Sequence, residues 1–356
     1  MESEIFKTSD YLKVLFQLSP EFQENFIERY EILKIVNMTQ PIGRRMLSTK
    51  TNISERIIRK ETDILKQNKL LESTLKGMII TNEGKKVLLT IDKLYFMFKG
   101  LDKTEELLAT YLGIKKVIIA PLNSNDEKVV LNSIGEYASK YLLEVINDKS
   151  IVGITGGSSV KNMIEQLNVS SKKYKNIVVV PTRGSLGDKA EIQANTLVEM
   201  LANKLSCKYK LLFTPDKLSE ETIKELQNEP EIKETIALIN SVNTLVFGIG
   251  QANVMARRRC LCCEESKMIE KKKAVAEAFG YYYNFEGKVV HEINTIGVDL
   301  HKFKQIKNLI AVAGGIEKVE AILAVTKLDS KLVLVTDETV ANEILKRFEE
   351  EKRCLK

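Results

Sequence analysis

The chain has little proline or glycine and no long apolar run. Six prolines and 18 glycines among 356 residues, with 44% hydrophobic residues, argue against disorder and predict a folded chain with one large and one small domain. No stretch approaches the roughly 20 apolar residues of a membrane span. Its first residues, Met1-Glu2-Ser3-Glu4, lack the basic-then-apolar profile of a signal peptide, so we expect a cytoplasmic protein without a membrane partner.

Cysteine and histidine are also scarce. The cysteines form no regular framework, which suits a reducing compartment. They are Cys207, Cys260, Cys262, Cys263 and Cys354. Adjacent thiols rarely close a tetrahedral site, and no histidine or fourth cysteine lies near the central three in sequence, so we expect no metal.

Positive charge is concentrated in one segment. Residues 41–70 hold eight Lys and Arg residues against three Asp and Glu residues, which gives this segment +5 of the net charge of +6. The sequence Asn52-Ile53-Ser54-Glu55 combines a capping residue, Asn52, with a glutamate three positions later and predicts a helix from Ser54 or Glu55 to about Gln67. One face of this helix is apolar, at Ile57, Ile58, Ile64 and Leu65. The opposite face is charged, at Glu55, Arg56, Arg59, Asp63 and Lys66.

The neighbouring segments complete a DNA-binding pattern. A short helix over Pro41–Ser48 and a turn over Thr49–Ile53 predict a helix-turn-helix, and the stretches 70–75 and 78–81 around Lys76-Gly77 predict a hairpin wing. We expect Arg56 and Arg59 to reach base edges or phosphates and Arg44 and Arg45 to contact the backbone. The full set of expected DNA-binding residues is Arg44, Arg45, Ser54, Arg56, Arg59 and Lys60. The alternative is an ordinary solvated helix face.

From about residue 115 the pattern changes to short apolar runs separated by helical segments. Such runs predict buried strands of a parallel sheet covered on both faces. They are Lys116–Ala120, Ile151–Thr155, Ile177–Pro181, Lys210–Thr214, Thr244–Gly248, Leu309–Ala313 and Leu332–Thr336. Between the two patterns, Lys85 to about Leu112 reads as largely helical, with an interruption at Gly100. We therefore expect a DNA-binding domain over residues 1–88, a linker helix over 89–114 and an α/β effector domain over 115–356.

A phosphate site is predicted where one of these strands ends. Thr155-Gly156-Gly157-Ser158-Ser159 follows the apolar run directly, and a strand-to-helix turn of this composition presents free backbone N–H groups to an anion. Further polar motifs follow later strands, and strand ends at one edge of an open sheet are where ligands bind. These motifs are Pro181–Gly184, Gln193–Asn195, Gly248–Ala252, Arg257–Arg259, Glu277–Tyr282, and Ala313–Gly315 with Lys318.

In this order the motifs resemble those of sugar-binding transcriptional regulators of the SorC/DeoR type, and the likeness covers nearly the whole chain, Pro41–Arg45 and Ile53–Arg56 included. The resemblance implies a winged helix-turn-helix followed by a Rossmann-like domain with the fold of sugar-phosphate isomerases and deaminases. It implies a repressor of glycolytic genes that binds operator DNA and takes fructose-1,6-bisphosphate as effector. The implied effector residues are Gly156, Gly157, Ser158, Ser159, Arg183, Gln193, Arg258, Glu277 and Lys318. Arginine forks and a lysine suit two phosphates.

Several alternatives stay open. The Gly-Gly turn could only allow a tight strand-to-helix passage, Arg257 or Arg259 could point inward in place of Arg258, and Glu277 could pair with a neighbouring cation. The regulator could sense another sugar or polyol phosphate. An isomerase or deaminase is less expected, because His291 and His301 lie outside the motifs and only convergence of Asp188, Asp299 and Asp337 would supply its acids. We therefore expect that the chain is not an enzyme and binds no cofactor. We expect it to form a homodimer or a homotetramer.

Overall fold

The structure is a computed structural model that describes residues 18–51, 53–122, 124–169, 174, 176–186 and 189–354. It divides into two compact units. The first runs to Thr104 and includes Pro121–Val130, and the second comprises Glu105–Ala120 and the chain from Leu131 onward. In the part described, no helix is long and apolar enough to cross a membrane.

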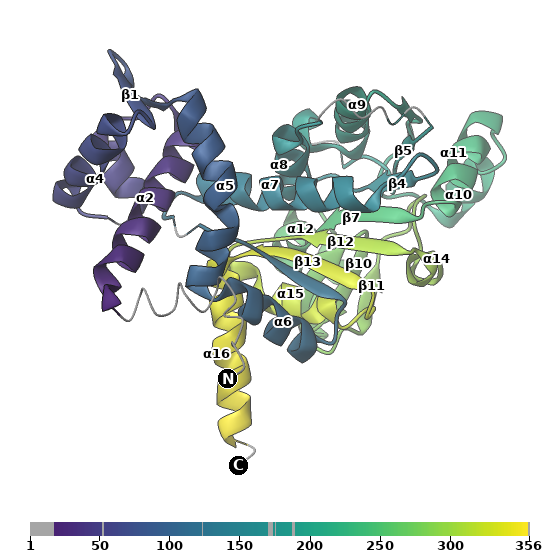
Figure 1. Cartoon of the computed structure of the whole chain (residues 1–356). Helices are drawn as coiled ribbons and strands as arrows, with labels where there is room; N and C mark the ends of the chain where they lie inside the picture. Colours follow the sequence, from purple (N-terminus) through teal and green to yellow (C-terminus); the bar gives the residue numbers. More distant parts are fainter. Residues whose placement is uncertain are drawn as a thin grey trace, which may run out of the picture. The chain divides into compact units, whose positions relative to one another are not determined.

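The first unit is a winged helix-turn-helix, as predicted (Figure 1). Its helices are α2 (Pro20–Thr39), α3 (Arg44–Thr51), α4 (Glu55–Gln67) and α5 (Asn82–Lys99), and the strands β1 (Leu71–Thr74) and β2 (Gly77–Ile80) form the hairpin wing. Helix α3 begins and ends about three residues later than the sequence predicts. The turn of the wing is Leu75-Lys76 rather than Lys76-Gly77, because Gly77 already pairs with Thr74.

Helix α4 has the predicted limits but a different cap and a different buried side. The Ser54 hydroxyl accepts a hydrogen bond from the Ile57 N–H, whereas the predicted cap, Asn52, lies outside the described residues. Ile58 and Leu65 are buried as predicted, but Ile57 and Ile64 are only half-buried. Glu61 and Thr62 are buried in their place. The apolar pattern therefore located the helix correctly and missed a carboxylate on its inner side.

Glu61 is held by a cation on another helix. Its Oε2 atom accepts a hydrogen bond from Arg29 Nε of α2 at 2.6 Å, and its carboxylate lies 3.1 Å from Lys60 Nζ. Burial opposes the negative charge, but these two cations outweigh it and lower the pKa of Glu61 below its ordinary value. The pair ties α4 to α2.

The predicted linker helix is divided. Helix α5 ends at Lys99, Gly100 adopts a left-handed conformation with φ of +65°, and α6 (Leu101–Leu112) follows at once. The N–H of Gly100 donates back to the last turn of α5. The interruption predicted at Gly100 is thus the C-cap of one helix and the start of the next.

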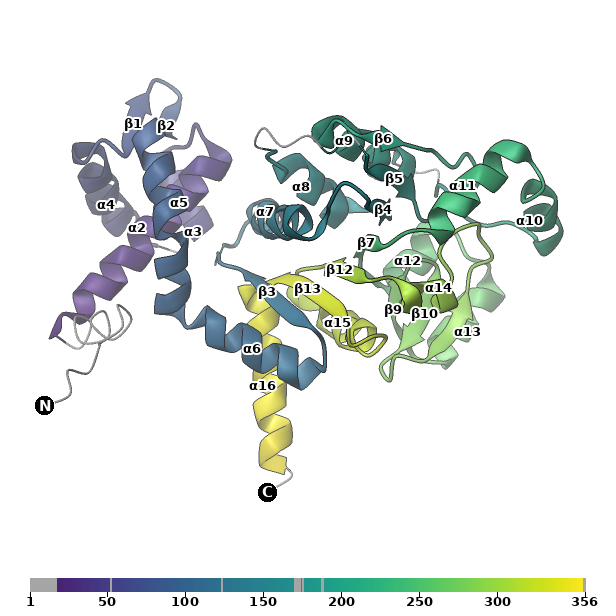
Figure 2. The same ribbon diagram turned by 45° about the vertical axis from the view of Figure 1, so that its right-hand side comes forward.

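The second unit is built on a seven-stranded sheet whose paired strands are all parallel, in the order β3-β13-β12-β7-β4-β5-β6. The strands are β3 (Lys116–Ala120), β4 (Ile151–Ile154), β5 (Val178–Pro181), β6 (Lys208–Tyr209), β7 (Thr244–Gly248), β12 (Asn308–Val312) and β13 (Leu332–Asp337). Helices α7 (Glu127–Val145) and α8 (Ser158–Gln166) lie on one side of this sheet, and α15 (Val319–Thr326) lies on the other (Figure 2). The remaining helices are α9 (Ala194–Leu205), α10 (Glu220–Leu226), α11 (Pro230–Asn240), α12 (Ala252–Arg258), α13 (Cys263–Lys271), α14 (Leu300–Gln305) and α16 (Glu338–Cys354), with 3-10 turns η1 (Ala190–Ile192) and η2 (Ile316–Lys318).

One predicted strand is largely wrong. The run Lys210–Thr214 is not a strand, because β6 covers only Lys208–Tyr209. Beyond it the side chain of Asn195 forms two hydrogen bonds with the backbone of Leu212, donating to its carbonyl at 2.9 Å and accepting from its N–H at 3.1 Å. A side-chain amide therefore satisfies the backbone there in place of a neighbouring strand.

The strand order places a crevice at the middle of the sheet. From β4 the chain moves outward through β5 and β6, then returns to β7 on the other side of β4 and continues outward through β12. The connections therefore diverge between β4 and β7, and ligands bind at the carboxyl ends of strands at such a switch point. At this place the Gly248 N–H donates to Thr155 Oγ1 at 3.3 Å and joins the two strand ends.

A second, antiparallel sheet begins directly after β7 in sequence, and α12 and α13 are inserted between its first two strands. Its order is β11-β10-β9-β8, from β8 (Gly250–Gln251), β9 (Ala274–Ala278), β10 (Tyr281–Asn284) and β11 (Val289–Glu292). Strand β8 begins two residues after β7 ends. Strand β9 pairs with β8 and so comes next to the carboxyl edge of the main sheet.

We expect Glu61→Gln to lower the free energy of unfolding at pH 7 by about 1.5–3 kcal/mol, because the amide loses the charge-assisted bond from Arg29. The pKa of Glu61 is lowered on folding, so its stabilisation is present above about pH 4.5 and is lost as the pH falls. Urea unfolding of the full chain between pH 3.5 and 7 measures both effects. Asp63→Asn, which removes a half-exposed carboxylate paired with Arg44, should cost at most about 1 kcal/mol, and equal losses would contradict the assignment.

Candidate functional site

The turn between β4 and α8 has the geometry of an anion site. Gly157 has φ of +126°, and a Cβ on Gly156 would lie 2.6 Å from the carbonyl oxygen of Ile192, so both glycines are required by the backbone path. The Gly157 N–H is not available to a ligand, because it donates to Ile192 at 2.9 Å. The first N–H groups of α8 that follow it have no acceptor within the helix and carry the positive end of the helix dipole.

All nine predicted effector residues line one cavity of about 240 Å³. Gly156, Gly157, Ser158 and Ser159 come from the β4–α8 turn. The others follow the ends of neighbouring strands or the second sheet. They are Arg183 after β5, Gln193 before α9, Arg258 at the end of α12, Glu277 on β9 and Lys318 in η2. Tertiary structure thus brings together residues that the sequence spreads over more than 160 positions.

Three residues of one cavity wall, Arg183, Arg259 and Glu277, belong to a buried cluster that Asp216 completes. Arg183 pairs with Asp216 and, through Nη1 at 3.2 Å, with Glu277. Arg259 pairs with the same two carboxylates at 2.9 Å each. Every one of these side chains is less than one-tenth exposed. The two positive and two negative charges compensate, so Arg183 contributes no net charge to the cavity together with its partners.

The cluster fixes the ionisation of its members. Burial alone would raise the pKa of Glu277, but Arg259 and Arg183 outweigh it and lower that pKa below its ordinary value. The Gly280 N–H also donates to Glu277 Oε1 at 2.7 Å. Burial opposes the charge of Arg259 as well, yet Glu277 and Asp216 raise its pKa. Glu277 is therefore a carboxylate that acts as a hydrogen-bond acceptor.

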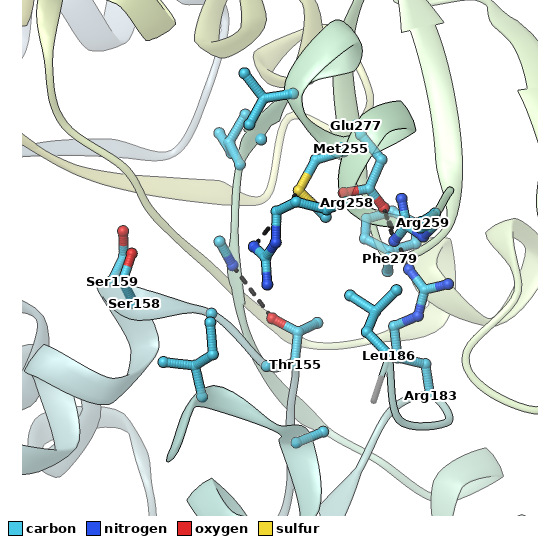
Figure 3. Close-up of a pocket in the computed structure, with 18 of the residues that line it drawn as sticks. Thr155, Ser158, Ser159, Arg183, Leu186, Met255, Arg258, Arg259, Glu277 and Phe279 are labelled. Carbon is cyan, nitrogen blue, oxygen red and sulfur yellow. Dashed lines mark hydrogen bonds and ion pairs between the residues drawn. The ribbon is translucent and has the colours of Figure 1, made fainter. Parts of the chain in front are cut away.

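The remaining cations of the cavity lie away from this wall. Arg258 is half-buried and extends across the cavity between Thr155 and Met255, and Ser158 and Ser159 lie on the side opposite Arg183 (Figure 3). Lys318 adds a second cation from η2. Positive groups therefore come from three elements that line the cavity: the start of α8, the end of α12 and η2.

The structure shows which residues of the arginine triplet face the cavity. Arg258 and Arg259 both line the cavity, whereas Arg257 is exposed. Glu277 pairs with neighbouring cations, which was the alternative role considered for it, and it also lines the cavity. Gln193 also makes structural bonds, since its Oε1 accepts from the Leu186 N–H at 2.9 Å.

The predicted effector residues did not include Asp216 or Phe279, although Phe279 lies within the motif Glu277–Tyr282. Asp216 follows the short edge strand and carries no motif of its own. Phe279 lines the cavity with a positive φ of 38° and packs edge-on against Phe247. A left-handed conformation at a bulky residue was the signal, and only the backbone reveals it.

Of the three aspartates that an enzyme would need, the two that the structure describes do not line the cavity. Asp299 caps α14 and Asp337 accepts from the Gly315 N–H, and neither lines the cavity. His291 and His301 do not line it either, and Asp188 lies outside the described residues. Among the described residues no three His, Cys, Asp or Glu side chains form a group that could hold a metal ion.

The predicted DNA-binding residues lie on one helix-turn-helix. Arg56 and Arg59 of α4 are exposed, and no described residue forms an ion pair with either. Arg45 is exposed on α3. The other three are engaged within the unit: Arg44 pairs with Asp63, Lys60 with Glu61, and the Ser54 hydroxyl caps α4.

Two known domain families match the chain, one in each part. The sugar-binding domain family matches residues 97–346, and the CggR N-terminal DNA-binding domain matches residues 26–95. The chain belongs to the SorC/DeoR-type sugar-binding transcriptional regulators. This family consists of DNA-binding regulators, so the chain is a transcriptional regulator and not an enzyme.

Individual relatives of this family are similar over most of the chain. The central glycolytic genes regulator of Bacillus subtilis is 38% identical over 93% of this chain and 97% of its own length. The regulator of the same name from Priestia megaterium is 35% identical over 95% of this chain and 98% of its own. A crystal structure of a SorC-family regulator from Enterococcus faecalis, 36% identical, covers 68% of this chain and 99% of that chain with a TM-score of 0.62.

We expect Arg259→Ala to destabilise this sugar-binding regulator by about 3–5 kcal/mol, because it leaves Asp216 and Glu277 buried with one cation fewer. Chemical denaturation of the full chain measures the loss. Arg257→Ala is the matched control two residues away, and its exposed side chain predicts a change within about 0.5 kcal/mol. A similar small change in both variants would show that the cluster does not support the fold.

Proposed function

We propose that the chain is a repressor of glycolytic genes whose affinity for operator DNA is modulated by fructose-1,6-bisphosphate. The observation that carries this proposal is the cavity at the switch point of the sheet, where a helix N-terminus and two further cations approach from different directions. A sugar with a phosphate at each end matches that arrangement. Similarity to the central glycolytic genes regulators supports the choice of genes.

Each part of the site has a distinct role in this proposal. The N–H groups of Ser158 and Ser159, with their hydroxyls, hold one phosphate. Arg258 and Lys318 hold the other. Glu277 accepts hydrogen bonds from the sugar hydroxyls, and Gln193 accepts or donates them. Arg183 orients Glu277 rather than binding a phosphate, because its charge is compensated within the cluster.

In the DNA-binding part, α4 enters the major groove. Arg56 and Arg59 reach bases or phosphates and Arg45 contacts the backbone. Residues 1–88 bind DNA, residues 89–114 form the linker helix between the two domains, and residues 115–356 bind the effector. The regulator acts as a homodimer or homotetramer in the cytoplasm, where paired winged helices meet an operator of matching symmetry. The effector works only through different affinities for the DNA-bound and released states.

The choice of effector predicts a ranking of ligands. Isothermal titration of the full chain should show saturable binding of fructose-1,6-bisphosphate with a micromolar or lower Kd and no turnover. Fructose-6-phosphate and glucose-6-phosphate should bind at least about tenfold more weakly, since each leaves one group of cations unpaired. Preference for a monophosphate would indicate a regulator of another sugar, and product formation would revive the isomerase or deaminase alternative.

The assignment of the two functions to two units predicts separable variants. Arg56→Ala should weaken binding to an operator duplex selected by the wild-type protein from a random library, and reduce the salt dependence by about one phosphate contact, without changing effector affinity. Arg258→Ala should weaken effector binding and leave DNA affinity in the absence of effector unchanged. Anisotropy and calorimetry on both variants measure this. Crossed effects would overturn the assignment.

A further inference from the structure

The tip of the wing carries a leucine that contacts nothing in its own unit. Leu75 is fully exposed, with a relative accessible area of 109%. Leu71, Met78 and Ile80 of the same hairpin are at most 5% exposed. The hairpin projects from the helices of its unit (Figure 1). A single exposed leucine on a protein surface is ordinary. Its place at the end of a projection from a DNA-binding unit is what calls for an explanation.

The wing is attached firmly to the helix-turn-helix. Ile42, just before α3, exchanges two backbone hydrogen bonds with Met78 of β2, at 3.0 and 2.8 Å. Gly77 lies so close to this segment that a Cβ would be 2.8 Å from the Ile42 backbone. The base of the wing therefore has a fixed position relative to α3, and α3 packs against α4.

The tip itself is also ordered. The Thr74 hydroxyl donates to the Gly77 carbonyl at 2.9 Å and accepts from the Lys76 N–H at 3.2 Å. These bonds close the turn around Leu75 and Lys76, both of which are exposed. The positive φ of this turn falls on Gly77, at +138°, and not on Leu75 or Lys76, so the turn accepts most residues at its tip. The turn itself therefore does not require a leucine there.

We propose that Leu75 enters the minor groove of the operator and wedges against a base step, while Lys76 pairs with a flanking phosphate. This inference rests on the DNA-binding function and adds a second point of sequence recognition to it. Apolar side chains, leucine among them, are the residues that proteins insert between base steps from the minor groove. Because pyrimidine–purine steps such as TA and CA are more easily kinked than other steps, the wedge reads the shape and flexibility of the sequence beside the site of α4.

The experiment uses the full chain and the operator duplex selected by the wild-type protein from a random library. A second duplex replaces adenine by 2,6-diaminopurine outside the segment protected by α4. This base places an amino group in the minor groove and leaves the major-groove edge unchanged. Binding is measured by fluorescence anisotropy for the wild type, Leu75→Ser and Leu89→Ser. The last is a control, since Leu89 is an exposed leucine on α5 of the same unit.

We expect the wild type and Leu89→Ser to bind the diaminopurine duplex at least about tenfold more weakly than the adenine duplex. Leu75→Ser should bind the adenine duplex about tenfold more weakly than the wild type and lose no further affinity on the modified duplex. Its melting temperature should match that of the wild type, because the side chain is fully exposed.

Three results would overturn the inference. Leu75→Ser could bind like the wild type, or it could lose affinity while keeping the full diaminopurine penalty, or the wild type could show no penalty. In each of these cases DNA binding itself would stand. A wild-type protein that selects no duplex from the library would instead overturn the DNA-binding function, and the wedge with it.

Discussion

The buried cluster of Arg183, Asp216, Arg259 and Glu277 is the interaction on which the second unit depends most. It joins four segments: the end of β5, the chain after β6, the turn after α12 and strand β9. These charges lie in a low-dielectric interior, where an unpaired charge costs several kcal/mol and a compensated set is tolerated. The cluster therefore holds the second sheet in register with the carboxyl edge of the main sheet, and so defines one wall of the cavity.

Because that wall carries no net charge, the positive charge of the cavity comes from other residues. With Arg183 and Arg259 neutralised by two carboxylates, the positive character of the cavity comes from the start of α8, from Arg258 and from Lys318. The site thus separates groups that attract phosphates from a charge-balanced wall that presents a carboxylate acceptor. This separation is the reason why we propose a ligand that carries anions at its ends and hydroxyls between them.

The first unit uses the same principle on a smaller scale. The Arg29–Glu61 pair fixes α4 on α2 from within, which leaves Arg56 and Arg59 on the exposed side of α4. The Ile42–Met78 bridge attaches the wing to the segment before α3. Helix α4 and the wing are therefore held in one fixed arrangement, and a preformed arrangement of this kind reduces the ordering cost of binding.

Local patterns in the sequence determined the elements. Short apolar runs located six of the seven predicted strands, the apolar face and charge pattern located α4, and the composition of Thr155–Ser159 located a glycine turn between a strand and a helix, because each of these depends on neighbours a few residues apart. The effector residues beyond that turn were implied by the ordered motifs of a family, and not by any single spacing.

Only the tertiary structure decided which charges meet. Arg183 and Glu277 lie 94 residues apart in sequence, and Arg29 and Glu61 lie 32 apart, so no local pattern could pair them or show that Glu61 is buried. Nor could a local pattern show that Asn195 of α9 satisfies the backbone of Leu212, within the run that was predicted as a strand. The physical reason is the same in each case: hydrogen bonds and ion pairs act over a few ångströms in space, and only the packed fold determines which distant residues come within that range.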